Sequence, residues 1–268
     1  MVERTHIVAV VNRKGGAGKT VTTLHLAGVL AGRGLRVLLC DLDPQASLTR
    51  ILLTDDLASP GIGTCLLRST FTARECLLRT PAGIDLLPGD KAVLRAEEEL
   101  KGTAGAFGRL ARVLRPLAGY DLALLDTPPG LSFTVQSAII AAGGAILPTC
   151  VTQHDLDAFV DTLDIFEQLR QDEMPHATPL AIVPNSVRRD NADLAGLEVL
   201  RATYGALVST PIPHAVAIKN AINARLPLSR AEPRAAALAG YEDLADRVAR
   251  ALHLGPPPAT VAAAHVRA

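Results

Sequence analysis

The chain has 268 residues, and its 27 lysines and arginines are balanced by 27 aspartates and glutamates, which excludes a strongly basic coat protein for nucleic acid but leaves room for a locally basic face. Hydrophobic residues make up 49% of the chain and charged residues 20%, so the sequence can bury a large core and is not disordered over most of its length. Aromatic residues are only 3% and tryptophan is absent, which disfavours nucleic-acid binding by base stacking on aromatic side chains.

Short apolar runs alternate with helical patterns along the chain, which is typical of parallel strands joined by crossover helices. The expected strands cover residues 7–11, 37–40, 84–87, 122–125, 145–147, 180–183 and 206–209. The expected helices cover residues 20–32, 91–114, 132–142, 156–171, 193–204 and 235–253. Because the strand segments are continuously apolar, both faces of the sheet should be covered. The prediction is an α/β fold: a mostly parallel twisted sheet of about seven or eight strands with helices on both faces.

No repeat or linker divides the sequence, so residues 1–255 are predicted to form a single domain and residues 256–268 a flexible tail. The N-terminus lacks the pattern of a signal peptide, and no apolar run reaches the roughly 18 residues that a membrane span needs. The cysteines form no C-x-x-C pair, which indicates reduced thiols rather than a disulfide frame or a zinc knuckle. These cysteines are Cys40, Cys65, Cys76 and Cys150. We therefore expect a soluble cytoplasmic protein.

The strongest motif is the run K-G-G-A-G-K-T at residues 14–20, which follows the first expected strand and precedes a helix. This is the context of a phosphate-binding loop, where glycines let backbone N–H groups close around phosphate oxygens at a helix N-terminus. Lys19 is expected to reach the β- and γ-phosphates, and the Thr20 hydroxyl to ligate Mg²⁺. The alternative, a flexible glycine turn, leaves the order strand, loop, Gly-Lys-Thr and helix unexplained. The residues expected to hold the nucleotide here are Lys14, Gly15, Gly16, Ala17, Gly18, Lys19, Thr20 and Val21.

Two carboxylates follow expected strands. Asp41 opens the run D-L-D-P-Q after the second strand, and Asp126 ends the apolar run that precedes T-P-P. Side chains at the carboxyl ends of parallel strands point into the crevice where α/β proteins bind ligands. A buried carboxylate is costly unless a cation is near, so Mg²⁺-bound water is a natural partner for Asp126; the alternative is a cap on the proline-rich turn. Asp43 precedes a proline and is expected to hold its own turn.

The phosphate-binding loop departs from the ordinary pattern, because its first glycine would fall on Arg13 and an extra lysine, Lys14, follows instead. With D-x-D-P-Q and the later Y-D-x-x-x-x-D-x-P-P at residues 120–129, this loop resembles the deviant Walker A motif of the ParA/MinD family of P-loop ATPases, in that family's order and spacing. The resemblance covers about residues 7–254. It implies an ATPase that forms an ATP sandwich dimer, in which Lys14 reaches the partner's nucleotide. The alternative for Lys14 is a solvated surface lysine.

The resemblance also implies roles for individual residues. The residues expected to be catalytic are Lys14, Lys19 and Asp41, with Asp41 beside the attacking water. The residues expected in the Mg²⁺ shell are Thr20, Asp41 and Asp126. An asparagine and a proline contact adenine in similar proteins, and Asn185 and Pro213 stand in those places; for either residue taken alone, an ordinary loop residue is the favoured alternative. Val21 replaces a second threonine common in the family, so one side-chain contact to phosphate is expected to be missing.

Within the family, ParA proteins bind DNA without reading its sequence, which needs basic side chains that face phosphates. The candidate residues are Arg188, Arg189, Lys219, Arg225 and Arg230. Scattered solubility charge is an equal alternative, and Ala217 stands where chromosomal relatives usually have an arginine. A MinD-like membrane helix is disfavoured because the C-terminal run has one arginine and no large apolar face.

The resulting expectation is a nucleoid-associated, ATP-dependent DNA partition protein. It would use ATP and Mg²⁺, bind non-specific DNA as an ATP-bound homodimer, and hydrolyse ATP slowly until a ParB-type centromere-binding protein stimulates it. An alternative is a ParA-like ATPase that positions a non-DNA protein cargo on the nucleoid, because the same ATPase core would serve both. A metabolic P-loop enzyme is less favoured, since such enzymes lack the extra lysine and D-x-D-P-Q together.

Overall fold

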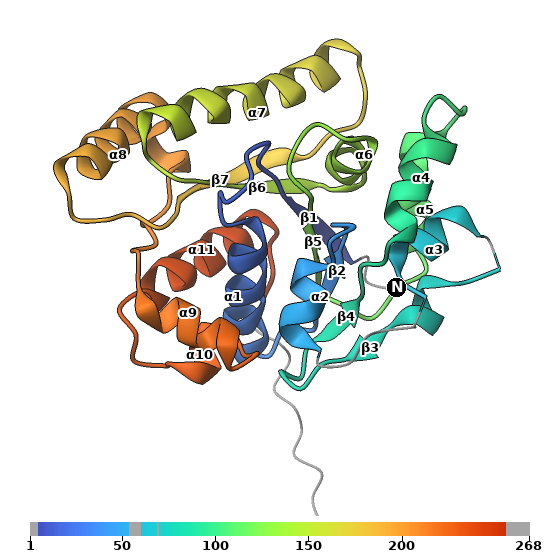
Figure 1. The fold of residues 1–268 in the computed structure, drawn as a ribbon, viewed down its shortest axis with the longest axis horizontal. Helices are drawn as coiled ribbons and strands as arrows, with labels where there is room; N and C mark the ends of the chain where they lie inside the picture. Colours follow the sequence, from blue (N-terminus) through green and yellow to red (C-terminus); the bar gives the residue numbers. More distant parts are fainter. Residues whose placement is uncertain (1–4, 54–59, 69, 256–268) are drawn as a thin grey trace, which may run out of the picture.

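The structure, a computed structural model, describes residues 5–53, 60–68 and 70–255, and its centre is one seven-stranded sheet (Figure 1). The strand order is β3-β4-β2-β5-β1-β6-β7, and every neighbouring pair is parallel except β3 with β4. The strands are β1 (His6–Val10), β2 (Val37–Asp41), β3 (Leu78–Arg79), β4 (Asp85–Leu87), β5 (Leu122–Asp126), β6 (Gly144–Thr149) and β7 (Thr178–Pro184). The predicted α/β fold with a mostly parallel sheet is confirmed.

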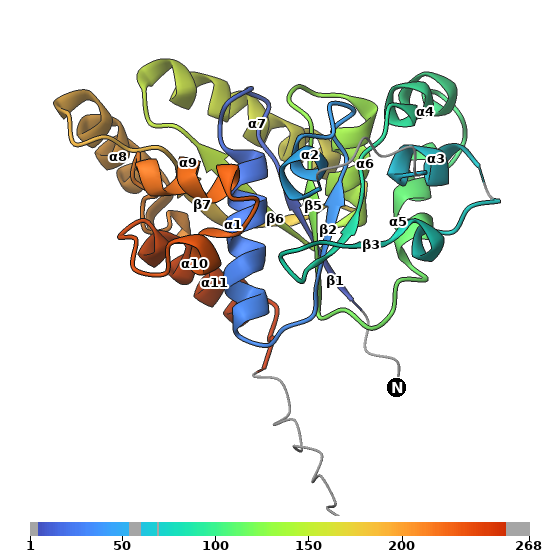
Figure 2. The same ribbon diagram turned by 60° about the horizontal axis from the view of Figure 1, so that its bottom comes forward.

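Helices cover both faces of the sheet (Figures 1 and 2). One face carries α1 (Lys19–Gly32), α2 (Ser47–Leu52), α9 (Val216–Asn223), α10 (Leu228–Ala231) and α11 (Leu238–Ala251). The other face carries α3 (Ile62–Leu67), α4 (Ala92–Leu100), α5 (Arg109–Leu114), α6 (Phe133–Ala141), α7 (Gln153–Gln171) and α8 (Asn191–Tyr204). None of the helices in the described part of the chain is long and apolar enough to cross a membrane.

Alternation along each strand explains how a continuously apolar run serves two cores. On β1, Val8 and Val10 pack with α1 and α11, whereas Ala9 packs into the core beneath α6 and α7. All three side chains are fully buried. A strand that is buried on both faces loses the polar alternation of a half-exposed strand, which is why the apolar runs predicted the sheet correctly.

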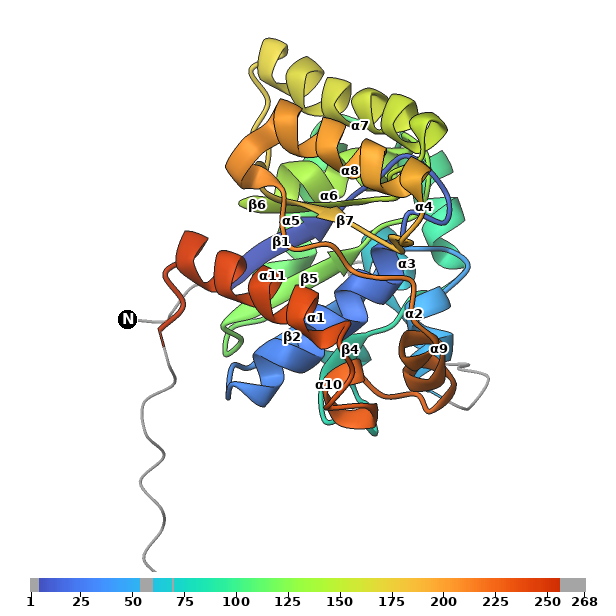
Figure 3. The same ribbon diagram turned by 90° about the vertical axis from the view of Figure 1, so that its left-hand side faces the viewer.

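The chain adds strands to one side of β1 and then to the other side, so the strand order reverses there. This reversal creates the crevice for the site. From β1 the chain crosses by α1 to β2 on one side, while β5 returns by α6 to β6 on the other side. The carboxyl ends of β1, β2 and β5 therefore meet at one edge of the sheet, where the loop between β1 and α1 also lies (Figure 3). In open α/β sheets this switch point is where ligands bind.

Two predicted elements are wrong. The helix expected over 91–114 is two helices, α4 and α5, because Gly102 and Gly105 adopt left-handed φ values of 81° and 69° that interrupt a helix. The strand expected over 206–209 is a 3₁₀ turn at Gly205–Leu207, after which Val208 makes a single parallel bridge to Ile182. Residues 256–268, predicted as a flexible tail, lie outside the described residues.

Candidate functional site

The loop between β1 and α1 is fixed at its base by side chains that bind backbone groups. The Asn12 Oδ1 atom accepts a 2.7 Å hydrogen bond from the Lys14 N–H, and its Nδ2 donates a 2.7 Å bond to the Pro148 carbonyl at the end of β6. The Thr127 hydroxyl donates to the Val10 carbonyl at 2.7 Å, and the Gly130 N–H donates to the Arg13 carbonyl at 2.7 Å. Hydrogen bonds at the ends of β1, β5 and β6 thus tie down the base of the loop, which is not a free glycine turn.

Glycine is required inside this loop. Gly16 and Gly18 have φ values of 79° and 91°, the left-handed region that side chains rarely adopt, and Gly18 is the N-cap of α1. A Cβ on Gly18 would lie 1.7 Å from Asn185 Nδ2, so this glycine also permits close packing. The backbone N–H groups of the first turn of α1 are left for an anion, as a phosphate site requires.

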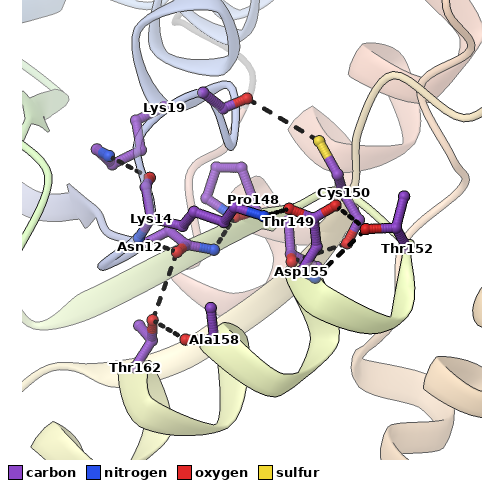
Figure 4. Close-up of polar contacts among 11 residues, drawn as sticks. Asn12, Lys14, Lys19, Pro148, Thr149, Cys150, Thr152, Asp155, Ala158 and Thr162 are labelled. Atoms are coloured by element: carbon purple, nitrogen blue, oxygen red, sulfur yellow. Dashed lines mark hydrogen bonds and ion pairs between the residues drawn. The ribbon is translucent and has the colours of Figure 1, made fainter.

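Lys19 lies inside the site rather than on its surface. It is only 7% exposed, and its Nζ donates a 3.1 Å bond to the Lys14 carbonyl across the loop (Figure 4). Burial lowers the pKa of this ammonium, and the carboxylates of Asp126 and Asp43 oppose that shift. A buried ammonium satisfied by one carbonyl keeps two donors for phosphate oxygens.

Lys14 makes an ion pair with Asp155 on the first turn of α7 (Figure 4). The side chains of Lys14 and Asp155 are 29% and 13% exposed, so the pair is partly shielded from solvent. Asp155 also accepts a bond from Thr152, the N-cap residue of α7. In this conformation the ammonium of Lys14 faces its own chain, so the alternative of a lysine surrounded by solvent does not describe it.

Asp41 and Asp126 lie side by side at the ends of β2 and β5, where they are register partners. Both are fully buried. Burial raises the pKa of Asp41 to about 6, although bonds from Thr49 and Asp43 oppose the shift. Burial and the neighbouring Asp41 charge raise the pKa of Asp126 well above its usual value, and the Thr20 hydroxyl and Lys19 counter this. Two adjacent buried carboxylates of this kind need a cation to remain ionised together.

The donor set fits Mg²⁺, which prefers oxygen ligands and keeps several of its waters. Asp126 Oδ2 is buried and has no hydrogen-bond partner among the described residues, and the Thr20 hydroxyl lies against the same carboxylate. Asp41 presents a second carboxylate from the next strand. The orphaned oxygen and the hydroxyl at the start of α1 therefore stand where a hydrated cation and its phosphate ligand would satisfy them.

Of the two residues predicted to contact adenine, Asn185 lies beside the loop, whereas Pro213 contacts the segment that follows β7. Asn185 is 8% exposed, and its Nδ2 donates a 3.1 Å bond to the Ala17 carbonyl. Pro213 is half-buried and pairs with Val187 in a parallel bridge, which brings the two segments together. Val21 is half-buried on the first turn of α1. The side-chain amide of Asn185 therefore anchors the phosphate-binding loop.

The residues predicted to bind DNA do not all share one environment. Arg188 and Arg189 are exposed just after β7, and Lys219 is exposed on α9. Arg225 donates to the carbonyls of Arg50 and Leu53 at 3.1 and 2.8 Å, and Arg230 donates to the Ala82 carbonyl at 2.6 Å. The last two arginines therefore also tie the helices after β7 to α2 and to the turn before β4.

Several residues that build the site escaped the sequence-based prediction. Asn12 and Asp155 were not singled out, although Asn12 immediately follows the first strand and Asp155 follows the N-cap Thr152 by three residues. Thr49, which donates two bonds to Asp41, lies eight residues beyond it. Each of these three residues is a polar residue close in sequence to a motif or a helix start, which is the signal that the sequence offers. The groups to which they bond become evident only in three dimensions.

Sequence and structure comparisons show which known proteins the chain is similar to. Residues 5–177 match the family described as an AAA domain. The chromosome-partitioning ATPase Soj of Thermus thermophilus is 33% identical over 250 residues, covering 90% of this chain and 94% of that protein. Cobyrinic acid a,c-diamide synthase from Mycobacterium smegmatis, solved with an ATP analogue and magnesium, superimposes with a TM-score of 0.80 and 28% identity over 94% of this chain and 97% of that one. A McdA variant from Cyanothece in complex with ATP shares the fold, with a TM-score of 0.82 and 20% identity over 94% of this chain and 98% of that one.

The fold, the loop and the paired strand-end carboxylates define a P-loop ATPase. Within that class, the Soj relatives and the extra lysine Lys14 point to one family. The chain belongs to the ParA/MinD family, with Soj-type partition proteins among its relatives.

Proposed function

We propose that this ATPase is a ParA-type DNA partition protein that works as an ATP-dependent homodimer. The observation that carries the proposal is Lys14, an extra lysine at the mouth of a phosphate-binding loop, held by a partly shielded carboxylate of its own chain. In an ATP-bound dimer, Lys14 leaves Asp155 and neutralises phosphate charge in the partner's site. The Soj relatives support this assignment.

Within one subunit, the described residues take distinct roles toward Mg²⁺-ATP. Loop amides and Lys19 bind the phosphates, Thr20 ligates the cation, and Asp126 holds its water shell. Asp41, with two bonds fixing one of its oxygens, orients the attacking water. When bound, Mg²⁺ supplies positive charge that neutralises the phosphates. Asn185 and Pro213 flank the base.

The mass of the protein in solution with ATP, with ADP and without nucleotide tests the dimer. A non-hydrolysable ATP analogue with Mg²⁺ should give a dimer, and the other two conditions a monomer. Lys14→Ala should bind the analogue and remain monomeric, whereas Arg13→Ala, a change of the neighbouring exposed cation, should dimerise. A dimer of Lys14→Ala as stable as the wild-type dimer would contradict the assigned role of Lys14.

DNA binding follows from the same switch. The ATP-bound dimer carries the basic face of each subunit and binds non-specific DNA. A monomer has half as many basic side chains and binds weakly, because affinity for DNA increases with the number of phosphate contacts. Gel mobility shifts at low and moderate salt should show binding only with ATP, weakened by Arg188→Ala with Arg189→Ala. Equal binding with and without ATP would refute the switch. A ParB-type centromere-binding protein is the expected partner that stimulates the slow hydrolysis, in the cytoplasm on the nucleoid.

The second candidate is the positioning of a protein cargo on the nucleoid by the same ATPase. The McdA fold neighbours are compatible with it. DNA and a ParB-type protein together should accelerate ATP turnover if the cargo is DNA. Stimulation by a different protein encoded beside this gene, with none by a ParB-type protein, would favour the second candidate.

A further inference from the structure

The carboxylate of Asp41 is held from behind by one threonine. Thr49, on α2, is 4% exposed, and both its backbone N–H and its hydroxyl donate to Asp41 Oδ2, at 2.8 and 2.7 Å. The other oxygen, Oδ1, accepts one 3.1 Å bond from the Asp43 N–H. A carboxylate oxygen can accept about two hydrogen bonds, so Oδ2 is saturated by Thr49 while Oδ1 keeps a free lone pair.

The direction of the hydroxyl bond is fixed by a third group. The Gly89 N–H donates to Thr49 Oγ1 at 2.9 Å. Because an amide N–H cannot accept, the single hydroxyl proton of Thr49 is left to point at Asp41. Gly89 allows this close approach, since a Cβ there would lie 3.0 Å from both Asp41 Cγ and the Asp43 carbonyl oxygen, which is tighter than most Cβ contacts. The hydroxyl is therefore clamped between the turn after β4 and the end of β2.

We propose that Thr49 is a positioning residue for ATP hydrolysis, which keeps Asp41 Oδ1 directed at the attacking water. The proposal rests on the role of Asp41 given under Proposed function. In the hydrogen bonds of the described chain, the Thr49 hydroxyl donates to Asp41 and accepts from Gly89 and makes no bond to the phosphate-binding loop, so we expect it to affect turnover through Asp41. Asp90, the residue after Gly89, accepts bonds from Gly61 and Thr64 at the start of α3, which ties this turn to α3.

Thr49→Val removes the hydroxyl but keeps the shape and the backbone N–H. We expect kcat at saturating Mg²⁺-ATP to fall roughly tenfold to a hundredfold, the effect of a lost hydrogen bond to a charged group. KM for ATP should stay within about twofold, because the loop is untouched. Thr49→Ser, which restores the hydroxyl, should return kcat to within about threefold of wild type, a rescue that a packing role would not produce.

Thr80→Val is the matched control. Thr80 is also a buried threonine, 3% exposed, whose hydroxyl donates to the Ile84 carbonyl at 2.7 Å at the opposite end of β4. It should lose stability as Thr49→Val does and keep its kcat. Should Thr49→Val not fold, Thr49→Cys, with a weak donor of similar size, makes the same comparison.

Kinetics of Asp41→Ala distinguish an error in the role of Thr49 from an error in the role proposed for Asp41. If Asp41→Ala turns over like wild type, the role of Asp41 is wrong and that of Thr49 falls with it. If Asp41→Ala is slow while Thr49→Val keeps the wild-type kcat, the Thr49 proposal alone is overturned. An equal loss of kcat in Thr80→Val, or no rescue by serine, overturns it as well.

Discussion

The ion pair between Lys14 and Asp155 predicts that removal of this carboxylate strengthens the ATP-bound dimer. If Lys14 must reach the partner's nucleotide, each subunit has to break this pair first. A pair whose side chains are 29% and 13% exposed is only partly screened by solvent, so we take about 1 kcal/mol for it, the upper end for surface pairs. Two subunits give about 2 kcal/mol, which corresponds to a dimer roughly 30-fold tighter in Asp155→Ala.

The assay is the dimer dissociation constant, measured by sedimentation over a range of protein concentrations with a non-hydrolysable ATP analogue and Mg²⁺. Asp161→Ala is the matched control: it removes a carboxylate from the same helix, α7, which pairs with Arg13 in an exposed salt bridge. That variant should dimerise like wild type. The same constant for Asp155→Ala and wild type, or an equal shift in both variants, would show that dimerisation does not open the Lys14 pair.

The remaining predictions concern binding, turnover and stability. Lys19→Ala should reduce ATP affinity by at least a hundredfold in calorimetry, on the order of two lost charge-assisted bonds to phosphate, and retained affinity would refute its placement. Asp41→Ala should bind ATP and accumulate as a dimer, and rapid turnover would contradict its role. His25 is buried, and burial lowers its pKa to about 4. The free energy of unfolding therefore has its full value above about pH 6.5, the pKa of histidine in the unfolded chain, and decreases as the pH falls toward 4. His25→Gln should lose about 2 to 3 kcal/mol less than wild type between pH 7.5 and 4.5 in urea unfolding; equal losses would exclude this histidine as the cause.

The sequence predicted the centre of the site because its signals are local. Asp41 and Asp126 each end a continuously apolar run, and in a parallel sheet the ends of such runs meet at one edge. The loop at residues 14–20 lies between a strand and a helix, so its position over that edge followed from the order of elements alone. The register that makes the two aspartates direct neighbours needed the strand order, which places β5 beside β2.

Other features depend on contacts between distant residues. The partner of Lys14 is 141 residues away, and no spacing rule marks it. Arg225 and Arg230 read as a basic patch, yet each also holds backbone carbonyls of a distant turn. The prediction of one continuous helix over 91–114 was wrong because its apolar spacing continues through Gly102 and Gly105. Only the backbone conformation shows that these two glycines interrupt the helix.

The charges at the site connect these observations. The carboxylates of Asp126 and Asp43 act on the Lys19 ammonium, and Asp41 lies beside Asp126, so the site holds more carboxyl groups than ammonium groups. Adding a triphosphate to this arrangement increases the excess of negative charge, which loop amides and a divalent cation offset only in part. A further positive charge would lower this excess, and Lys14 does not supply it to its own subunit while it is paired with Asp155. In the proposed dimer, exchange of this lysine between subunits would supply the charge only when two nucleotide-bound chains meet, and would thereby couple hydrolysis to dimerisation by electrostatics.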